Sequence, residues 1–370
     1  MSRLRVLFLI VTMIFLSGCW DQQLLRDKLM ISGVSIDQNE EGKLIVGVSS
    51  IDVTGKGGGQ FEINSRIFTA NSGNLVRAGE LMSYQGTGSI ELSKTSLLLI
   101  GEQVASHDIY PLFDVHYRNV NTNMGARVAV VKGSALQALT KNAKQAKKLT
   151  GSLVRLITME ERKKGLPAEN VRSLLTEMTG PEQDFILPYM EQSGGKLQIG
   201  GAALFHNRAY SGIKLTMNQM DVLSMLQGKR TQGITYDIQL PSRETGTIRM
   251  ASLVVKDTHI DKNIHVSGKR ITVDLHLRAQ ADLVEYPNLI HFTDTTYAEL
   301  RRLTSEQLLE DIKKVITAIQ KANCDALDLA EHIVAFYPGL WSSIKWDTVY
   351  PNIQMNPSVD VKVESNGVLK

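Results

Sequence analysis

The chain has 370 residues, of which 43% are hydrophobic and 21% are charged, and its formal net charge is +3. This composition is typical of folded globular proteins and excludes a largely disordered chain. The small net charge gives no electrostatic footprint for nucleic acid, so no nucleic-acid partner is expected.

The first residues have the pattern of a bacterial lipoprotein signal peptide, predicted over residues 1–18. Arg3 and Arg5 precede an apolar run that is too short to span a bilayer but has the length of a signal-peptide core. The sequence Leu-Ser-Gly-Cys ending at Cys19 then resembles a lipobox. We therefore expect cleavage between Gly18 and Cys19, and lipid on the Cys19 thiol. An ordinary signal peptide followed by a chance cysteine is the alternative.

Acylation of Cys19 has consequences for the mature chain. Cleavage removes two arginines and leaves 39 basic and 38 acidic residues, a net charge of +1. The one other cysteine, Cys324, is then without a disulfide partner. We interpret Cys324 as a small packed residue in a helix, with a reactive thiol as the alternative. Because Trp20 and Asp21 follow Cys19 directly, the tether is short and the first domain should lie near the bilayer.

Strands and helices alternate through residues 19–195, which predicts an N-terminal α+β domain. Residues 30–37 and 43–53 are expected to form a hairpin, because β-branched residues alternate on either side of a polar, glycine-containing turn. Further strands are expected near 66–69, 96–100 and 127–131, and helices near 73–84, 152–164 and 168–178, with one more ending near 117. The polar run that ends at Gly195 predicts a domain boundary.

The second half is predicted to hold a small middle α+β domain over residues 196–245 and a C-terminal α+β domain over residues 246–370. Its expected strands are 197–205, 209–215, 234–240, 248–256, 260–266, 271–283 and 357–363, with a short helix over 218–226. The longest helix is expected over residues 304–333, with Thr304 and Gln307 as a capping box. Its apolar stripe is more typical of a core than of a partner interface.

Sequence patterns typical of enzymes are absent, including a Gly-x-Ser-x-Gly elbow, a His-Glu-x-x-His helix, a Cys-x-x-Cys pair and an EF-hand loop. His259, His265 and His276 fall on consecutive predicted strands, and we interpret them as solvent-exposed positions because no ligand recurs at metal-binding spacing. Asp282 and Glu285 straddle a predicted strand end. We predict no catalytic residue, no cofactor and no metal. A surface hydrolase whose site is assembled by geometry alone is the alternative.

Several short blocks, taken in order, resemble the Ger(x)C family, the lipoprotein C subunits of spore germinant receptors. They are Gly18-Cys19-Trp20-Asp21, Ser32–Asp37, Leu97–Glu102, Gly201–Phe205, Asp325, Trp341, Trp346, Tyr350-Pro351, Val359–Val363 and Gly367. The chain departs from the family at Leu327–Ala330, where members usually have a Phe-Gly-Phe-Gly-like stretch, and after Arg118, where members often have an Asp-Pro pair. These departures indicate a divergent branch.

The resemblance implies a three-domain α+β lipoprotein without a catalytic site. It would lie on the outer face of the spore's inner membrane and contact integral membrane subunits of the A and B types. The alternative is a solute-binding lipoprotein of a transporter, which should have two doubly wound lobes and a flexible linker after the cysteine. The sequence leaves open whether Trp341 and Trp346 are core or interface residues; core is favoured because aromatic residues beside a long helix usually cover it.

Overall fold

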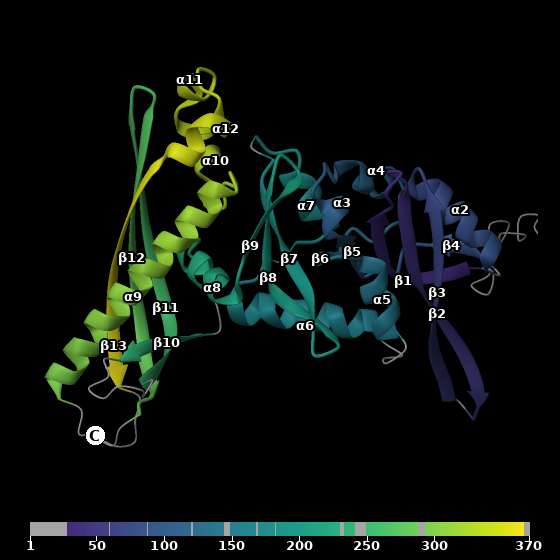
Figure 1. Ribbon diagram of the computed structural model, residues 1–370, viewed down its shortest axis with the longest axis horizontal. Helices are drawn as coiled ribbons and strands as arrows, with labels where there is room; N and C mark the ends of the chain where they lie inside the picture. Colours follow the sequence, from purple (N-terminus) through teal and green to yellow (C-terminus); the bar gives the residue numbers. More distant parts are fainter. Residues whose placement is uncertain are drawn as a thin grey trace, which may run out of the picture.

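The computed structural model describes residues 28–58, 60–86, 88–119, 121–143, 149–167, 169–181, 183–229, 233–240, 249–287 and 293–365. In these residues the chain forms a larger mixed sheet in its N-terminal half and a four-stranded sheet in its C-terminal half (Figure 1). Helices cover both faces of the first sheet and one face of the second. The predicted α+β class is confirmed.

The first sheet has the strand order β3-β2-β1-β5-β6-β7-β8-β9, with β4 paired to the start of β1. Its strands are β1 (Lys28–Gln38), β2 (Leu44–Gly57), β3 (Gln60–Ser72), β4 (Ser89–Glu91), β5 (Leu97–Gly101), β6 (Arg127–Val131), β7 (Phe185–Ser193), β8 (Lys196–His206) and β9 (Ala209–Leu215). Parallel pairing joins β1, β5, β6 and β7, whereas antiparallel hairpins form both edges. The predicted hairpin of β1 and β2 is present.

Central strand β5 explains why helices lie on both faces of this sheet. All five of its residues are buried, as in parallel strands that are covered on both sides. The helices of this half are α2 (Leu75–Gln85), α3 (Glu102–Ala105), α4 (Tyr110–Arg118), α5 (Ala135–Ala143), α6 (Leu149–Lys164), α7 (Val171–Glu177) and α8 (Met217–Leu226). Helices α2, α4 and α7 share one core with Leu98, and helices α5 and α6 share another with Leu99.

The second sheet has the order β10-β11-β12-β13. Its elements are β10 (Ile234–Leu240), β11 (Arg249–Ser267), β12 (Arg270–Glu285), α9 (Asp294–Lys321), α10 (Leu329–Phe336), α11 (Pro338–Trp341), α12 (Trp346–Val349), η2 (Tyr350–Asn352) and β13 (Gln354–Ser365). Helix α8 lies between the two sheets (Figure 1), and its last seven residues are all buried. A helix that is buried all round belongs to the core, so one apolar core runs from the first sheet into the second.

The long C-terminal helix differs from the one predicted over residues 304–333. Helix α9 begins at Asp294 and ends at Lys321, and a seven-residue loop separates it from α10. The predicted cap at Thr304 is wrong, because Thr304 lies inside the helix and its hydroxyl donates to the carbonyl of Leu300. Thr293 is the N-cap. Cys324 is buried as predicted, but it lies in the loop and not in a helix.

The boundary predicted at residue 195 falls within a hairpin of the first sheet. Gly194 and Gly195 form the turn between β7 and β8, and the ladder runs from Ser193 paired with Lys196 to Phe185 paired with Phe205. Strand β7 was not among the predicted strands. The division into domains at 195 and 245 remains a prediction, since residues 241–248 are not described.

A glycine at position 201 is required by the path of β8. Gly201 has φ +133°, and a Cβ there would lie 1.8 Å from the carbonyl oxygen of Leu215 in β9. Replacing Gly201 by alanine should therefore lower the free energy of unfolding by about 3 kcal/mol, measured by urea denaturation. The matched control is Gly79→Ala in α2, where nothing lies within 4 Å; it should raise stability by about 0.5–1 kcal/mol. Equal urea midpoints for Gly201→Ala and the parent chain would contradict this account.

Candidate functional site at the junction of the two sheets

The predicted lipid-attachment residue Cys19 and the cleavage residue Gly18 lie outside the described residues, as does Trp20. In the part of the chain that the structure describes, no helix is both long and apolar enough to cross a membrane. The polar features that the structure does place are a buried junction between the two sheets and an open polar face on the second sheet.

The junction loop, residues 322–328, connects α9 to α10 and joins the two halves of the molecule. Two of its residues, Asn323 and Asp328, have positive φ angles, a conformation that Asn and Asp tolerate better than most residues. Its backbone receives side chains from three separate elements: Gln227 donates to the carbonyl of Ala326, Lys262 to that of Leu327, and Tyr350 to that of Cys324. The loop is therefore held by the end of α8, by the second sheet and by η2.

Two buried carboxylates organise this loop. One oxygen of Asp184, just before β7, accepts the backbone N–H of Asp325 at 2.8 Å. The other lies 2.9 Å from Nδ1 of His206 at the end of β8. Asp325 in turn accepts the N–H groups of Leu329 and Ala330 at 3.1 and 2.6 Å, which satisfies donors in the first turn of α10.

Burial sets the acidities of the junction. It raises the pKa of Asp325 to about 7, although the two N–H donors of α10 oppose the shift. Burial also raises the pKa of Asp184 against opposing hydrogen bonds from His206 and the Asp325 N–H. For His206 burial lowers the pKa, but the hydrogen bond to Asp184 and its charge outweigh burial, so the net shift is upward.

Cys324 and the tryptophans belong to the packing around this loop. Burial raises the pKa of the Cys324 thiol well above its ordinary value, which fits a packed residue and not a nucleophile. Trp346 is buried, with its ring 5.8 Å from that of Tyr350 and 5.6 Å from that of Trp341. Trp341 is partly buried against the same core. Both tryptophans thus cover the junction, as favoured from the sequence.

The acidic residues of the family-like blocks have structural roles of the same kind. Asp37 accepts the N–H groups of Ala135 and Leu136 and so caps the start of α5. Glu102 accepts the hydroxyl of Tyr189 at 2.8 Å. Each of these carboxylates joins two segments that are far apart in the chain.

The three histidines singled out from the sequence lie on the open polar face of the second sheet and do not meet. His259 and His265 are exposed on β11, as expected, and His276 on β12 is half-exposed. Each lies near a carboxylate, at Asp261, Asp274 and Asp360 respectively. Among the described residues, no group of three or more His, Cys, Asp or Glu side chains is placed to hold a metal ion. Asp282 is buried in β12 and paired with Lys256, and Glu285 is the last residue of that strand, so the strand ends two residues later than predicted.

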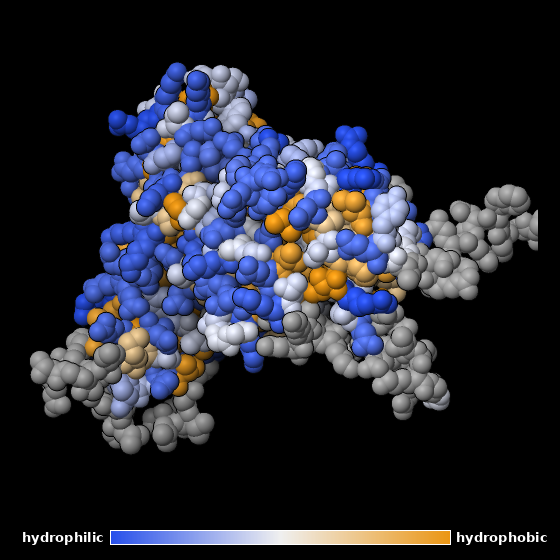
Figure 2. Space-filling view, turned by 45° about the vertical axis from the view of Figure 1, so that its right-hand side comes forward, coloured by the Kyte–Doolittle hydropathy of each residue, from blue (hydrophilic) through white to orange (hydrophobic). Residues whose placement is uncertain are grey.

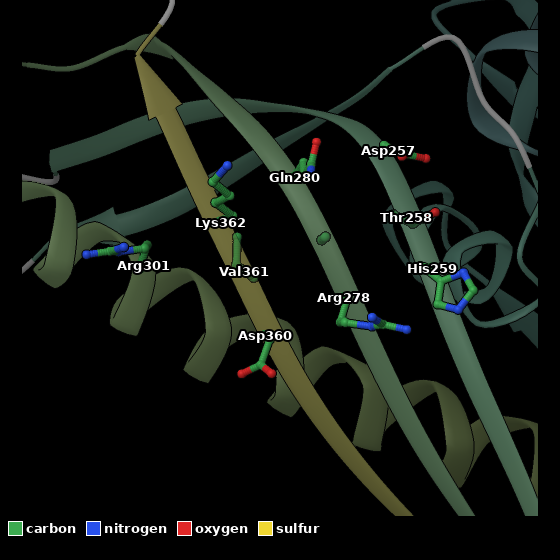
Figure 3. Close-up of a pocket in the computed structure, with 10 residues that line it drawn as sticks. Asp257, Thr258, His259, Arg278, Gln280, Arg301, Asp360, Val361 and Lys362 are labelled. Carbon is green, nitrogen blue, oxygen red and sulfur yellow. The ribbon is translucent and has the colours of Figure 1, made fainter.

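A shallow groove of 390 Å³ lies on this sheet between β11, β12, β13 and α9 (Figure 3). Arg278 in this groove already donates to Asp261 at 2.8 Å. Nearby, Ser358, His276 and Asp360 form the one serine–histidine–aspartate constellation that the structural contacts show in the described residues. Nδ1 of His276 lies 2.9 Å from the Ser358 hydroxyl, and its Nε2 lies 3.4 Å from Asp360.

This constellation lacks what a hydrolase needs. A catalytic aspartate is buried and orients the ring of its histidine, whereas the Asp360 side chain is 77% exposed. The Ser358 hydroxyl also contacts the carbonyl of Leu275, 3.3 Å away. We therefore interpret the three residues as a polar ladder across two paired strands.

The junction makes stability depend on pH. The pKa of Asp325 is higher in the folded chain than the value of about 3.9 expected when unfolded. The folded state therefore binds this proton more tightly, and stability should fall as pH rises from about 4 to about 7. Asp325→Asn keeps an acceptor oxygen but cannot ionise. Between pH 5.5 and 8 its free energy of unfolding, measured in urea, should therefore fall by about 2 kcal/mol less than that of the parent chain. Asp360→Asn, an exposed control, should follow the parent. Identical pH profiles for all three chains would refute this assignment.

Comparison with known proteins identifies the family. The family model "Spore germination protein N-terminal domain" matches residues 21–192, and "Spore germination B3/ GerAC like, C-terminal" matches residues 200–367. Spore germination protein GerQC of Bacillus cereus is 24% identical over 98% of each chain. Spore germination protein KC of Bacillus subtilis (strain 168) is 21% identical over 98% of this chain and 94% of that one.

The fold is also shared with a solved structure. The crystal structure of the GerBC protein has a TM-score of 0.57 and 15% identity, covering 90% of this chain and 96% of that one. Because the two family models together span nearly all of residues 21–367, the chain belongs to the Ger(x)C family of GerAC-like spore germination proteins.

Proposed function

We propose that this chain is the lipid-anchored, non-catalytic C subunit of a spore germinant receptor. It acts by contact with integral membrane subunits of the A and B types at the outer face of the spore's inner membrane. The observation that carries this proposal is the match of two consecutive family models, over residues 21–192 and 200–367, the first of which begins two residues after Cys19. Its role in spore germination follows from the family; the anchor, the partners and the location are what we add.

The structure is compatible with a function through contacts with partner proteins. Its ionisable groups at the junction are buried and tied to backbone groups, which suits a rigid body that transmits force or position between partners. The solute-binding alternative would need two doubly wound lobes, and the described strands of the second sheet form an antiparallel hairpin meander completed by one parallel edge strand.

The anchor is tested by Cys19→Ala in spores that lack the native copy. The variant should leave the membrane fraction and abolish the response to one class of nutrient, because it has no thiol to carry lipid. Loss of refractility after nutrient addition and immunoblots of membrane fractions are the measurements. Cys324→Ala is the matched control, because it alters the one other cysteine and leaves the lipobox intact. If the Cys19→Ala protein leaves the membrane while germination is unchanged for every nutrient, the lipid anchor is supported and the role in a germinant receptor is contradicted.

The absence of catalysis is tested by His276→Ala and Ser358→Ala. If the polar ladder has no chemical role, spores that carry either variant should germinate at the parent rate, since both residues lie on an open face and not in the core. Asp184→Ala serves as the comparison, because it removes a buried acceptor and should lower the amount of folded protein. A germination defect in His276→Ala spores with normal protein levels would revive a hydrolytic function.

A further inference from the structure

Helices α2 and α4 carry an exposed apolar surface. Three of the most exposed large hydrophobic side chains in the described residues lie there: Val76 is 61% exposed, Tyr84 is 82% exposed and Tyr117 is 74% exposed. We name these three residues and the groove between their helices the α2–α4 face. Val76 and Tyr84 are eight positions apart in α2, a spacing that places both on one side of a helix.

A groove connects the two helices within this face. It has a volume of 400 Å³ and is lined by the first turn of α2 and by residues along the length of α4. Leu75, Leu112 and Val115 are among the apolar residues in its wall. Val76 lines this groove, and Tyr117 directly precedes Arg118, which also lines it. Tyr84 lies further along α2, towards its C-terminal end. In Figure 2, hydrophobic side chains gather more densely on the N-terminal half than over the second sheet.

The described chain begins at one end of this face. Lys28 pairs with Ser89 of the short strand β4, and the side chain of Leu29 lies against Gly86, where an added Cβ would be 2.4 Å from it. Gly86 directly follows the last residue of α2. The chain therefore enters the fold beside the C-terminal end of α2, the end at which Tyr84 lies.

The distance from Cys19 limits what this face can touch. Only residues 20–27 separate Cys19 from Lys28, and nine extended steps reach at most about 30 Å. Helix α2 is about 16 Å long, so its exposed residues Val76 and Tyr84 lie within that reach of a lipid on Cys19. The second sheet lies at the other end of the molecule (Figure 1).

The charges on the face favour a neutral contact. Arg77 is paired with Glu80 at 2.7 Å, and Arg118 with Asp114 at 2.8 Å. Lys28 has Glu91 as its partner at 4.0 Å. Since each of these cations has a carboxylate beside it, attraction to anionic lipid is weak. Exposed tyrosine, in contrast, has an apolar ring and a polar hydroxyl, and it is enriched where a bilayer meets water.

We propose that the α2–α4 face rests on the bilayer surface that holds the Cys19 lipid, with Tyr84 and Tyr117 at the level of the headgroups. This inference rests on the proposed anchor. It fixes the orientation of the subunit, because the second sheet with its open polar face then projects away from the lipid.

Single cysteines placed on the face test the contact. Val76→Cys, Tyr84→Cys and Tyr117→Cys are each labelled with an environment-sensitive fluorophore in the full acylated chain on phosphatidylcholine vesicles. Acylated Cys19 and buried Cys324 do not react, so the label reports one position. The matched controls are Met159→Cys in α6 and Phe336→Cys in α10, which are 51% and 69% exposed in the parent chain. Emission from the three face positions should shift to the blue and be quenched by doxyl lipid, whereas the controls should behave as in water.

A second arm separates this inference from the proposed anchor. The same labelled chains, with a hexahistidine segment in place of Cys19, are held on vesicles that contain nickel-chelating lipid. Blue-shifted emission at the face in this arm supports the inference even if Cys19 proves not to be acylated, which gel mobility and flotation report separately. Aqueous emission from all three face positions on an acylated or chelated chain overturns it. A blue shift that appears only when integral membrane subunits are added to the vesicles also overturns it, because the face would then contact a protein partner.

Discussion

The hydrogen bond from the backbone N–H of Asp325 to the carboxylate of Asp184 holds the two halves of this molecule together. It joins residues 141 positions apart and lies in a buried site, where an unpaired carboxylate would be costly. His206 supports the same carboxylate from β8, and Asp325 in turn supports the first turn of α10. Separating the sheets would leave several of these groups without partners at once, so the junction favours a single relative position of the two halves.

The same device recurs in the N-terminal half. Asp37 holds the start of α5 against β1, and Glu102 holds Tyr189 of β7. These carboxylates and Asp325 all belong to the blocks by which the family is recognised. In this chain Asp37 and Glu102 accept hydrogen bonds from distant segments, and Asp325 accepts those of the first turn of α10. An acidic residue in a family signature therefore marks a structural joint in this protein, and its replacement should first be judged by folding.

Local residue patterns predicted many of the strands and helices, but they did not predict the contacts between segments that are distant in the sequence. The alternation in β1, β2 and β12 and the apolar run of β5 gave correct strands, because those patterns reflect burial of the strand itself. The end of α9 was missed, because the backbone turns through positive φ at Asn323 and Asp328, and no residue pattern in the sequence marks that turn. Asp184 and His206 carried no signal of their own. Asp184 lies outside every motif, His206 only follows the block that ends at Phe205, and β7 and β8 bring the two residues together across 22 positions. Asp325 was visible only through the family resemblance.

The position of β13 at the edge of the second sheet has a consequence for the order in which the protein can fold. Strands β1 to β9 occupy a continuous stretch from Lys28 to Leu215, so the first sheet can form as soon as that stretch is made. Strand β12 must wait for β13, whose residues follow the whole of α9 and the junction loop. Until then one edge of β12 has unpaired backbone groups, and Asp184 lacks the N–H of Asp325 until the junction loop has been made. A chain that emerges with its N-terminus first, in synthesis or in export, therefore passes through an intermediate with half of its core, and such species are prone to aggregation.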